Sequence, residues 1–252
     1  MNMSTRRRLS QSLKVALTAA VTCASCKVGS LVDSGTATLG DATHLMFVTQ
    51  PSNGTAGEAM RVQVSAVDSN GAVVAVFNGQ VTLALADNPG NDQLHGTVTV
   101  TAIQGTATFA DVAIDHAASG YSLSAATTGL TGATSGHFDV AAGAPATATY
   151  TTQPTSTSSG STITPAVQVQ VVDAFGNPVT AYSGNVTIAL AHDGSVLRDA
   201  SLQGTTTVTA TSGRASFSNL HIDQSGLGYT LGAGVPTGGT PEVSQPFDVV
   251  PL

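Results

Sequence analysis

Apolar and polar residues alternate over short segments of the chain with a period of two, which is typical of β-strands that bury one face. Within residues 60–66 the apolar side chains occupy every second position, and Arg61, Gln63 and Ser65 lie between them. No segment shows the 3.6-residue period of an amphipathic helix. The pattern therefore predicts an all-β protein built from short strands.

This strand pattern occurs twice, with an offset of 105 residues. The segment 167–190 consists of a strand, a tight turn and a strand, and the segment 62–85 has the same order. Each copy continues through about seven short strands within roughly 100 residues, separated by turns. Such spacing is typical of an antiparallel sandwich of two sheets, so the sequence predicts two sandwiches in tandem.

The repeats also define the expected boundaries. We name residues 44–142 module 1 and residues 147–252 module 2. Residues 143–146 form the linker, which is short enough to limit the relative motion of the modules. Residues 27–43 are small and polar, and predict a flexible tether.

A turn follows the first strand of the repeated segment in each module. In module 1 the turn is Asp68–Gly71, whose Asn-Gly pair predicts a hairpin with these two residues at positive φ. In module 2 the turn is Asp173–Asn177, which shares the aspartate and the glycine. We expect the shared residues to be scaffold.

The second copy carries a family resemblance. Its run VQVQVVDAFGNPV at residues 167–179, followed by GNVT at residues 184–187, resembles the bacterial immunoglobulin-like repeats of invasin- and intimin-type surface proteins. Tyr121 and Tyr229 also resemble the tyrosine corner of immunoglobulin-like folds. The resemblance covers about residues 44–252, and module 1 departs from it by lacking the proline. It implies two tandem immunoglobulin-like antiparallel β-sandwiches that serve as spacers or adhesive modules, and it carries over no catalytic residue.

The N-terminus has the composition of an export signal. Residues 1–14 include three consecutive arginines, and an apolar run follows at residues 15–24, about half the length that spans a bilayer. We expect residues 1–26 to be a signal peptide. Cys26 follows two small residues, as in bacterial lipoprotein signals, although Cys23 replaces the usual aliphatic residue. Lipidation of Cys26 and plain cleavage beside it remain alternatives, so the exported protein is either anchored to the membrane or secreted.

Charge is distributed unevenly between this signal and the rest of the chain. Five of the eight basic residues precede residue 28. Beyond it, three arginines and all fifteen acidic residues give a net charge of −12. Such a body repels nucleic acid and anionic membranes. We therefore expect no nucleic-acid partner, and contact with a membrane only through a lipid anchor.

Residues that could perform catalysis form no recognisable set. The six histidines never fall at i, i+2 or i, i+4 spacing, and no Gly-x-Ser-x-Gly motif occurs. Aspartates in turns have a structural reason to be there, because their side chains bond the turn backbone. The sequence therefore predicts that the protein is not an enzyme and has no cofactor, with calcium as the one alternative.

One acidic loop offers the oxygen ligands that calcium prefers. Asp87, Asn88, Asn91 and Asp92 crowd the loop 86–96, without the spacing of an EF-hand. These four residues are a candidate calcium site, and an ordinary solvated loop is the alternative.

Phe175 is the one aromatic residue without a counterpart in the other module. The other ten phenylalanines and tyrosines pair at equivalent positions, as core packing requires. Phe175 is therefore either a ligand contact, for example with carbohydrate, or a cover for one end of the sandwich.

These patterns predict an exported, non-enzymatic cell-envelope or surface protein with a role as structural spacer, in adhesion or in protein interaction. The alternative is a small carbohydrate- or calcium-binding module protein. A protein or a glycan at the cell surface is the expected partner, bound by the loops that differ between the two copies. Edge strands without lysine add self-association as a further hypothesis.

Overall fold

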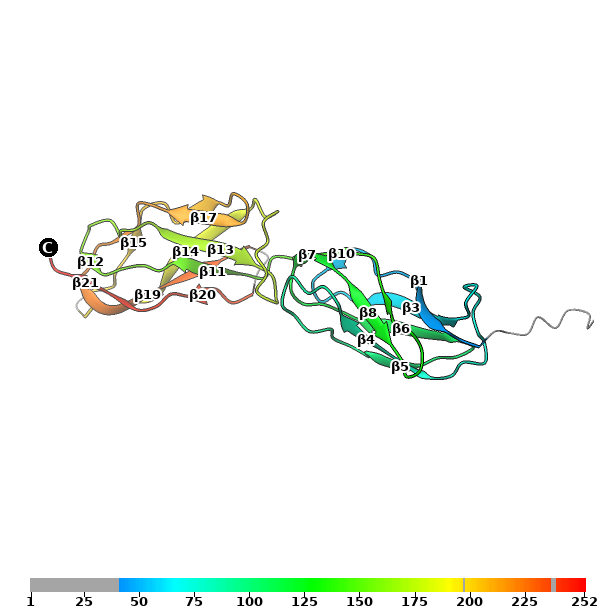
Figure 1. Ribbon diagram of the computed structural model, residues 1–252. Coiled ribbons are helices and arrows are strands. Elements are labelled where there is room, and N and C mark those ends of the chain that lie inside the picture. The colour runs from blue at the N-terminus through cyan, green and yellow to red at the C-terminus, as the bar shows by residue number, and fades with distance from the viewer. Residues whose placement is uncertain (1–40, 197, 237–238) are drawn as a thin grey trace, which may run out of the picture. The chain divides into compact units, whose positions relative to one another are not determined.

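The computed structural model describes residues 41–252, apart from residues 197 and 237–238 (Figure 1). The predicted signal peptide, most of the predicted tether and Cys26 lie outside these residues. The regular secondary structure of the described residues consists of strands alone. Within the same residues, the structure contains no helix that could cross a membrane. The all-β class predicted from the sequence is confirmed.

Module 1 is built from three sheets, with strand orders β1-β3-β6, β5-β4-β8-β9 and β2-β10-β7. Ser122 alone separates β7 from β8 and so connects the last two sheets. The strands are β1 (His44–Thr49), β2 (Gly54–Thr55), β3 (Met60–Val67), β4 (Gln80–Leu85), β5 (Thr99–Thr101), β6 (Thr106–Val112), β7 (Ala118–Tyr121), β8 (Leu123–Ala126), β9 (Ala133–Thr134) and β10 (Phe138–Ala141).

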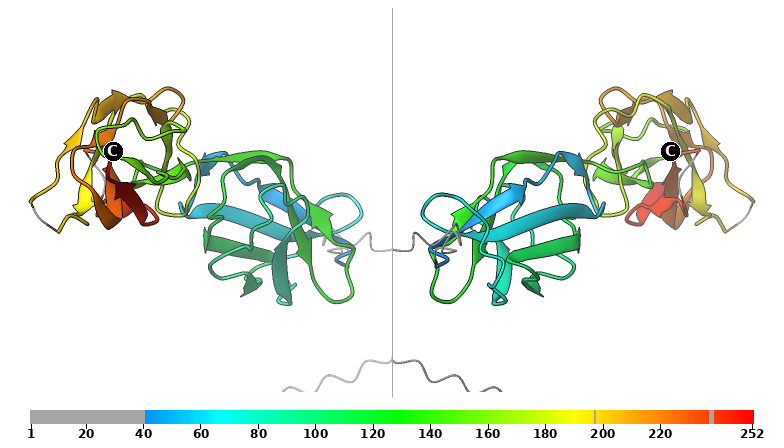
Figure 2. Two further views of the ribbon diagram at one scale, coloured as in Figure 1. Left: turned by 90° about the vertical axis from the view of Figure 1, so that its left-hand side faces the viewer. Right: turned by 90° about the vertical axis from the view of Figure 1, so that its right-hand side faces the viewer.

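Module 2 repeats this arrangement, with strand orders β11-β13-β17 and β12-β21-β19-β14-β16 (Figures 1 and 2). A further strand, β20, pairs with β19, and β15 pairs with β18. The strands are β11 (Thr147–Thr152), β12 (Thr157–Ser158), β13 (Val167–Val172), β14 (Asn185–His192), β15 (Leu202–Gln203), β16 (Thr207–Thr209), β17 (Arg214–Phe217), β18 (His221–Ile222), β19 (Gly226–Gly234), β20 (Glu242–Val243) and β21 (Phe247–Val250).

The pairing of strands is antiparallel as predicted, with one short parallel pair in each module. β2 runs parallel to β10, and β12 runs parallel to β21. These pairs are two residues long, and alternation of side chains along a strand carries no information about the direction of its neighbour.

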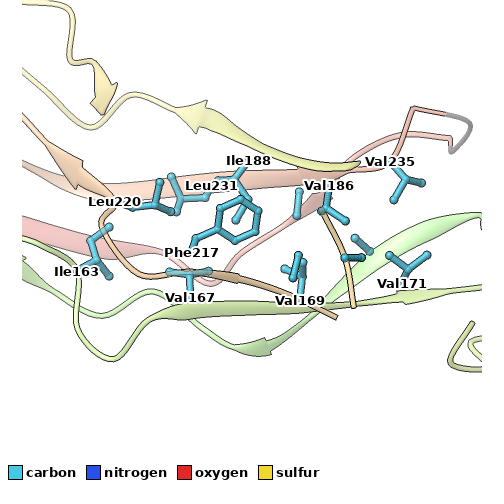
Figure 3. Close-up of a cluster of buried hydrophobic side chains, with 14 of the residues drawn as sticks. Ile163, Val167, Val169, Val171, Val186, Ile188, Phe217, Leu220, Leu231 and Val235 are labelled. Carbon is cyan, nitrogen blue, oxygen red and sulfur yellow. The ribbon is translucent and has the colours of Figure 1, made fainter. Parts of the chain in front are cut away.

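Buried apolar side chains form two clusters, one in each module. Val167, Val169 and Val171 of β13 belong to the cluster of module 2, as the two-residue period requires, and the second half of β13 is also buried on its other face. Figure 3 shows Phe217 with Val169 on one side and Ile188 on the other. Each cluster lies within one of the predicted modules, and the module boundaries and the independent folding of each module stay predictions.

The repeat is visible in matching contacts of aromatic residues. The ring centroids of Tyr121 and Phe138 lie 5.9 Å apart, and those of Tyr229 and Phe247 lie 6.1 Å apart. The Tyr121 hydroxyl donates to the carbonyl of His116, and the Tyr229 hydroxyl bonds the carbonyl of the equivalent residue in module 2. Both tyrosine corners predicted from the sequence are therefore present.

The turn after β3 differs from the predicted hairpin. Gly71 has a φ of +83°, whereas Asn70 is not among the residues with positive φ. A local bridge joins Val67 to Val73, but the next strand, β4, belongs to a different sheet from β3. The prediction that β3 and β4 form a hairpin is wrong, because a local turn signal does not show into which sheet the following strand goes.

Candidate functional site

The turn Asp173–Asn177 is built around the carboxylate of Asp173. One carboxylate oxygen, Oδ1, accepts hydrogen bonds from the backbone N–H groups of Phe175 and Asn177, both at 2.9 Å. Asp68 holds the turn of module 1 in the same way, with bonds from Asn70 and Ala72. The shared aspartate is therefore scaffold, as the comparison of the two copies predicts.

The other oxygen of Asp173 reaches the linker. Oδ2 accepts hydrogen bonds from the backbone N–H of Gly143 at 2.8 Å and from the side-chain amide of Asn177 at 2.9 Å. Asp173 is only 3% exposed. Burial by itself raises the pKa of this carboxyl, but the bonds from Asn177, Gly143 and Phe175 outweigh burial and hold the pKa below its ordinary value.

Asn177 extends the turn onto module 1. Its side-chain nitrogen donates to the carbonyl of Asp115 at 2.7 Å, and its side-chain oxygen accepts from the N–H of Ala117 at 2.9 Å. The side chain is almost fully buried, with 7% of the residue exposed. Ala72 occupies the equivalent position in module 1 and has no group that could form such bonds. We refer to these contacts between the turn and module 1 as the joint.

Phe175 also belongs to the joint. Its ring lies against Gly57, so that a Cβ added to this glycine would overlap the ring. Gly57 has a φ of +75°, a conformation that glycine adopts without strain. Phe175 keeps 44% of its surface exposed. The structure therefore places the ring on the end of module 1, and its contact with a ligand stays a prediction.

Sequence comparison found Phe175 but missed the other residues of the joint. The available signal was the difference between Ala72 in module 1 and Asn177 at the equivalent position of module 2. The alanine shows that the turn itself does not require a polar side chain at this position. Its partners on module 1 are backbone groups, which have no signature in the sequence.

Acid is expected to weaken the contribution of Asp173 to stability. The pKa of the folded state lies below the unfolded value of about 3.9, so the contribution is complete above about pH 3.9 and is lost as the pH falls through the lower, folded pKa. Urea unfolding between pH 2 and pH 6 would measure it as the difference between the wild type and Asp173→Asn. That difference should shrink below about pH 3.9; a difference independent of pH would contradict the assignment.

The four candidate calcium ligands do not share one role. The side chain of Asp92 is largely buried, and its Oδ2 accepts from the N–H groups of Asp115 and His116. Burial by itself raises the pKa of this carboxyl, but the backbone hydrogen bonds lower it by a larger amount, so the net shift is downward. Asn88 bonds the backbone of Asp92, and Asp87 accepts from the hydroxyl of Ser122.

Asn91, the fourth candidate, has a φ of +50° and closes the turn that begins at Asn88. Over residues 41–252, with the gaps given above, no three His, Cys, Asp or Glu side chains are grouped to hold a metal ion. The side-chain oxygens of Asp87, Asn88 and Asp92 thus have hydrogen-bond partners within the loop or beside it.

Removal of calcium is expected to leave thermal stability unchanged. The reason is that the Asp92 carboxylate already accepts hydrogen bonds from backbone N–H groups, which supply the positive charge density that a cation would otherwise provide. Thermal unfolding with EDTA, and again with added calcium, would measure this. A midpoint that falls with EDTA and recovers with calcium, but does not fall in Asp87→Asn, would restore the calcium site.

Comparison with known proteins finds only distant similarity. No profile of a known protein family matches the chain, and no curated protein has a significantly similar sequence. Among solved structures, the chain is similar to FdeC, an Escherichia coli adhesin, with 16% identity and a TM-score of 0.37. That match covers 80% of this chain and 62% of the adhesin, so the chain spans less than two thirds of its length.

Two other solved structures match over a similar share of this chain. Domains 5–6 of the S-layer protein SbsC match with 18% identity and a TM-score of 0.29, over 83% of this chain and 98% of that chain. β-Glucuronidase 3 of Bacteroides uniformis matches with 14% identity and a TM-score of 0.28, over 82% of this chain and 24% of the enzyme. At these values none of the similarities identifies a role for this chain.

Proposed function

We propose that the protein is an exported, non-enzymatic spacer of the bacterial cell envelope or surface, which holds two immunoglobulin-like modules in a defined relation. The observation that carries this proposal is the joint. Asn177 and Asp173 use their side chains to bond the backbone of module 1 and of the linker, rather than a ligand. A flexible linker alone would need no such bonds.

Other features support export and an invasin- or intimin-type relationship. The basic and apolar order of residues 1–26 is that of a signal peptide. The body has no cysteine, so its stability comes from the two apolar clusters and not from disulfides. The repeated run at residues 167–179 resembles that family of surface repeats.

The absence of enzymatic activity is part of the proposal. The most buried carboxylate of the joint, Asp173, has a pKa below its ordinary value and stays ionised at neutral pH. A carboxylate of this kind is a structural acceptor and is poorly suited to acid catalysis, which needs a raised pKa.

Mass spectrometry of the mature protein and surface proteolysis of intact cells would test the proposal together. We expect a new N-terminus at or near Cys26, and cleavage of the chain by protease added to intact cells. Acylation of the N-terminus that is lost in Cys26→Ser would indicate a lipid anchor, and an unmodified N-terminus would indicate secretion. An intracellular protein that retains residues 1–26 would contradict export.

A further inference from the structure

The end of module 2 repeats the surface of module 1 that receives the turn Asp173–Asn177. We propose that this end is a docking surface for an Asp-x-Phe-Gly-Asn turn presented by a further immunoglobulin-like module of the same kind as module 2. The proposal deepens the spacer role and rests on it, because it names the partner that such a spacer would join. Three observations on equivalent residues of the two modules support it.

The first observation concerns Gly57 and Gly160. Both have the same backbone conformation, with φ of +75° and +74°. The N–H of Gly57 donates to the carbonyl of Ile114 at 2.9 Å, and the N–H of Gly160 donates to the carbonyl of Ile222 at 2.8 Å. The ring of Phe175 covers Gly57, whereas no atom lies within 4 Å of a Cβ built on Gly160. The same glycine conformation is thus present in both modules, but an aromatic ring covers only the glycine of module 1.

The second observation concerns the backbone groups that bond Asn177. In module 1 they are the carbonyl of Asp115 and the N–H of Ala117. The equivalent groups in module 2 are the carbonyl of Asp223 and the N–H of Ser225, placed by the matching tyrosine corner. Neither group forms a hydrogen bond within the described residues. A side-chain amide positioned like that of Asn177 would satisfy both.

The third observation is the apolar surface beside these groups. Leu227 is 72% exposed and Val250 is 47% exposed. With Ser225 and Pro251 they line one shallow hollow. Ser119 and Ala141 occupy the positions of Leu227 and Val250 in module 1, so the end of module 2 is the more apolar of the two. Exposed apolar side chains gathered around unpaired polar groups are typical of a surface that binds protein.

The sequence of the two turns decides which partner fits. The turn of module 1 has Asn70 and Ala72 at the positions of Phe175 and Asn177, so it offers neither the ring nor the amide. The turn of module 2 is already engaged by its own module 1. A second copy of the chain therefore has no free turn of the required kind, and the occupant is a separate module whose turn carries both residues.

A chain extended by one module would test the proposal with a partner of known sequence. Residues 1–250 would be followed by a second copy of residues 142–252, which reproduces the spacing between β10 and β11. We expect hydrogen exchange at the Ser225 amide of the original module 2, measured by NMR, to slow about tenfold relative to the unextended chain, because this amide gains a hydrogen-bonded partner. The Ala117 amide serves as the internal reference for a formed joint.

The control is the same extended chain with Phe175→Ala and Asn177→Ala in the added copy only. Its Ser225 amide should exchange at the rate of the unextended chain. Equal exchange at Ser225 in both extended chains, with Ala117 protected in both, would overturn the proposal. Protection of Ser225 that rises with the concentration of the unextended chain would also overturn it, in favour of a second copy as occupant. These measurements use purified protein, so they are independent of whether export occurs.

Discussion

Replacement of Phe217 by alanine is expected to lower the free energy of unfolding of module 2 by about 3–5 kcal/mol, the usual cost of removing a buried aromatic side chain. Phe217 is only 1% exposed and belongs to the apolar cluster of module 2. It lies beside Val167 in the pairing of β13 with β17, between the two layers of that module (Figure 3). No neighbouring side chain is free to fill the space of a phenyl ring without repacking.

The same experiment tests whether the modules fold independently. In denaturant unfolding followed by hydrogen exchange, Phe217→Ala should accelerate global exchange in module 2 and leave most of module 1 unchanged. Phe109→Ala is the matched variant, because Phe109 occupies the equivalent position in the cluster of module 1. Phe109→Ala should accelerate exchange in module 1 and leave most of module 2 unchanged. If either variant destabilises both modules equally, the chain folds as one cooperative unit and the predicted boundary at residues 143–146 is not a domain boundary.

Replacement of Asn177 by alanine is expected to remove about 2 kcal/mol of coupling between the modules. The variant loses the bonds to the Asp115 carbonyl and the Ala117 N–H, and each such bond contributes about 0.5–1.5 kcal/mol. The bond to Asp173 is lost as well, which leaves a buried carboxylate with one donor fewer. We expect faster hydrogen exchange at the Ala117 amide and an unfolding midpoint at a lower denaturant concentration.

Asn70→Ala is the matched control for this variant. Asn70 lies in the equivalent turn of module 1, is exposed, and contributes its backbone N–H to that turn. Its replacement should change the unfolding midpoint little. The joint would lose its assigned importance if Asn177→Ala and Asn70→Ala had equal effects, or if exchange at Ala117 did not respond to Asn177→Ala.

Most of the fold could be predicted from local patterns. The alternation in β3 and β13 identifies the face that joins the apolar cluster, because successive side chains of any extended strand point to opposite sides. It does not predict that the opposite face is buried as well in the second half of each strand, where Ser65 and Gln170 lie. The pairing of Phe109 with Phe217 across the repeat identifies core positions, since both modules must fill the same space. The parallel pairs and the sheet to which β4 belongs were not predictable, because they depend on partners distant in sequence.

The candidate site shows the same limit more sharply. Phe175 was identified by comparison of the copies, but a ring without a counterpart is equally consistent with a ligand contact and with an end cover. Only its position against Gly57 shows which surface it contacts. The four oxygen-bearing residues of the loop 86–96 were grouped by sequence, yet the fold directs Asp92 and Asp87 to different hydrogen-bond partners.

The sequence by itself determined that this chain forms short strands in two similar copies, which turns contain the structural aspartates, and which side chains fill the cores. These are properties of short segments, since the two-residue period and the Asx turn act within a few residues. Only the tertiary structure decided that Asn177 joins the modules and that an equivalent surface on module 2 lies open. The partners of Asn177 are backbone groups 62 and 60 positions away, and a backbone N–H or carbonyl is the same in every sequence until the fold places it.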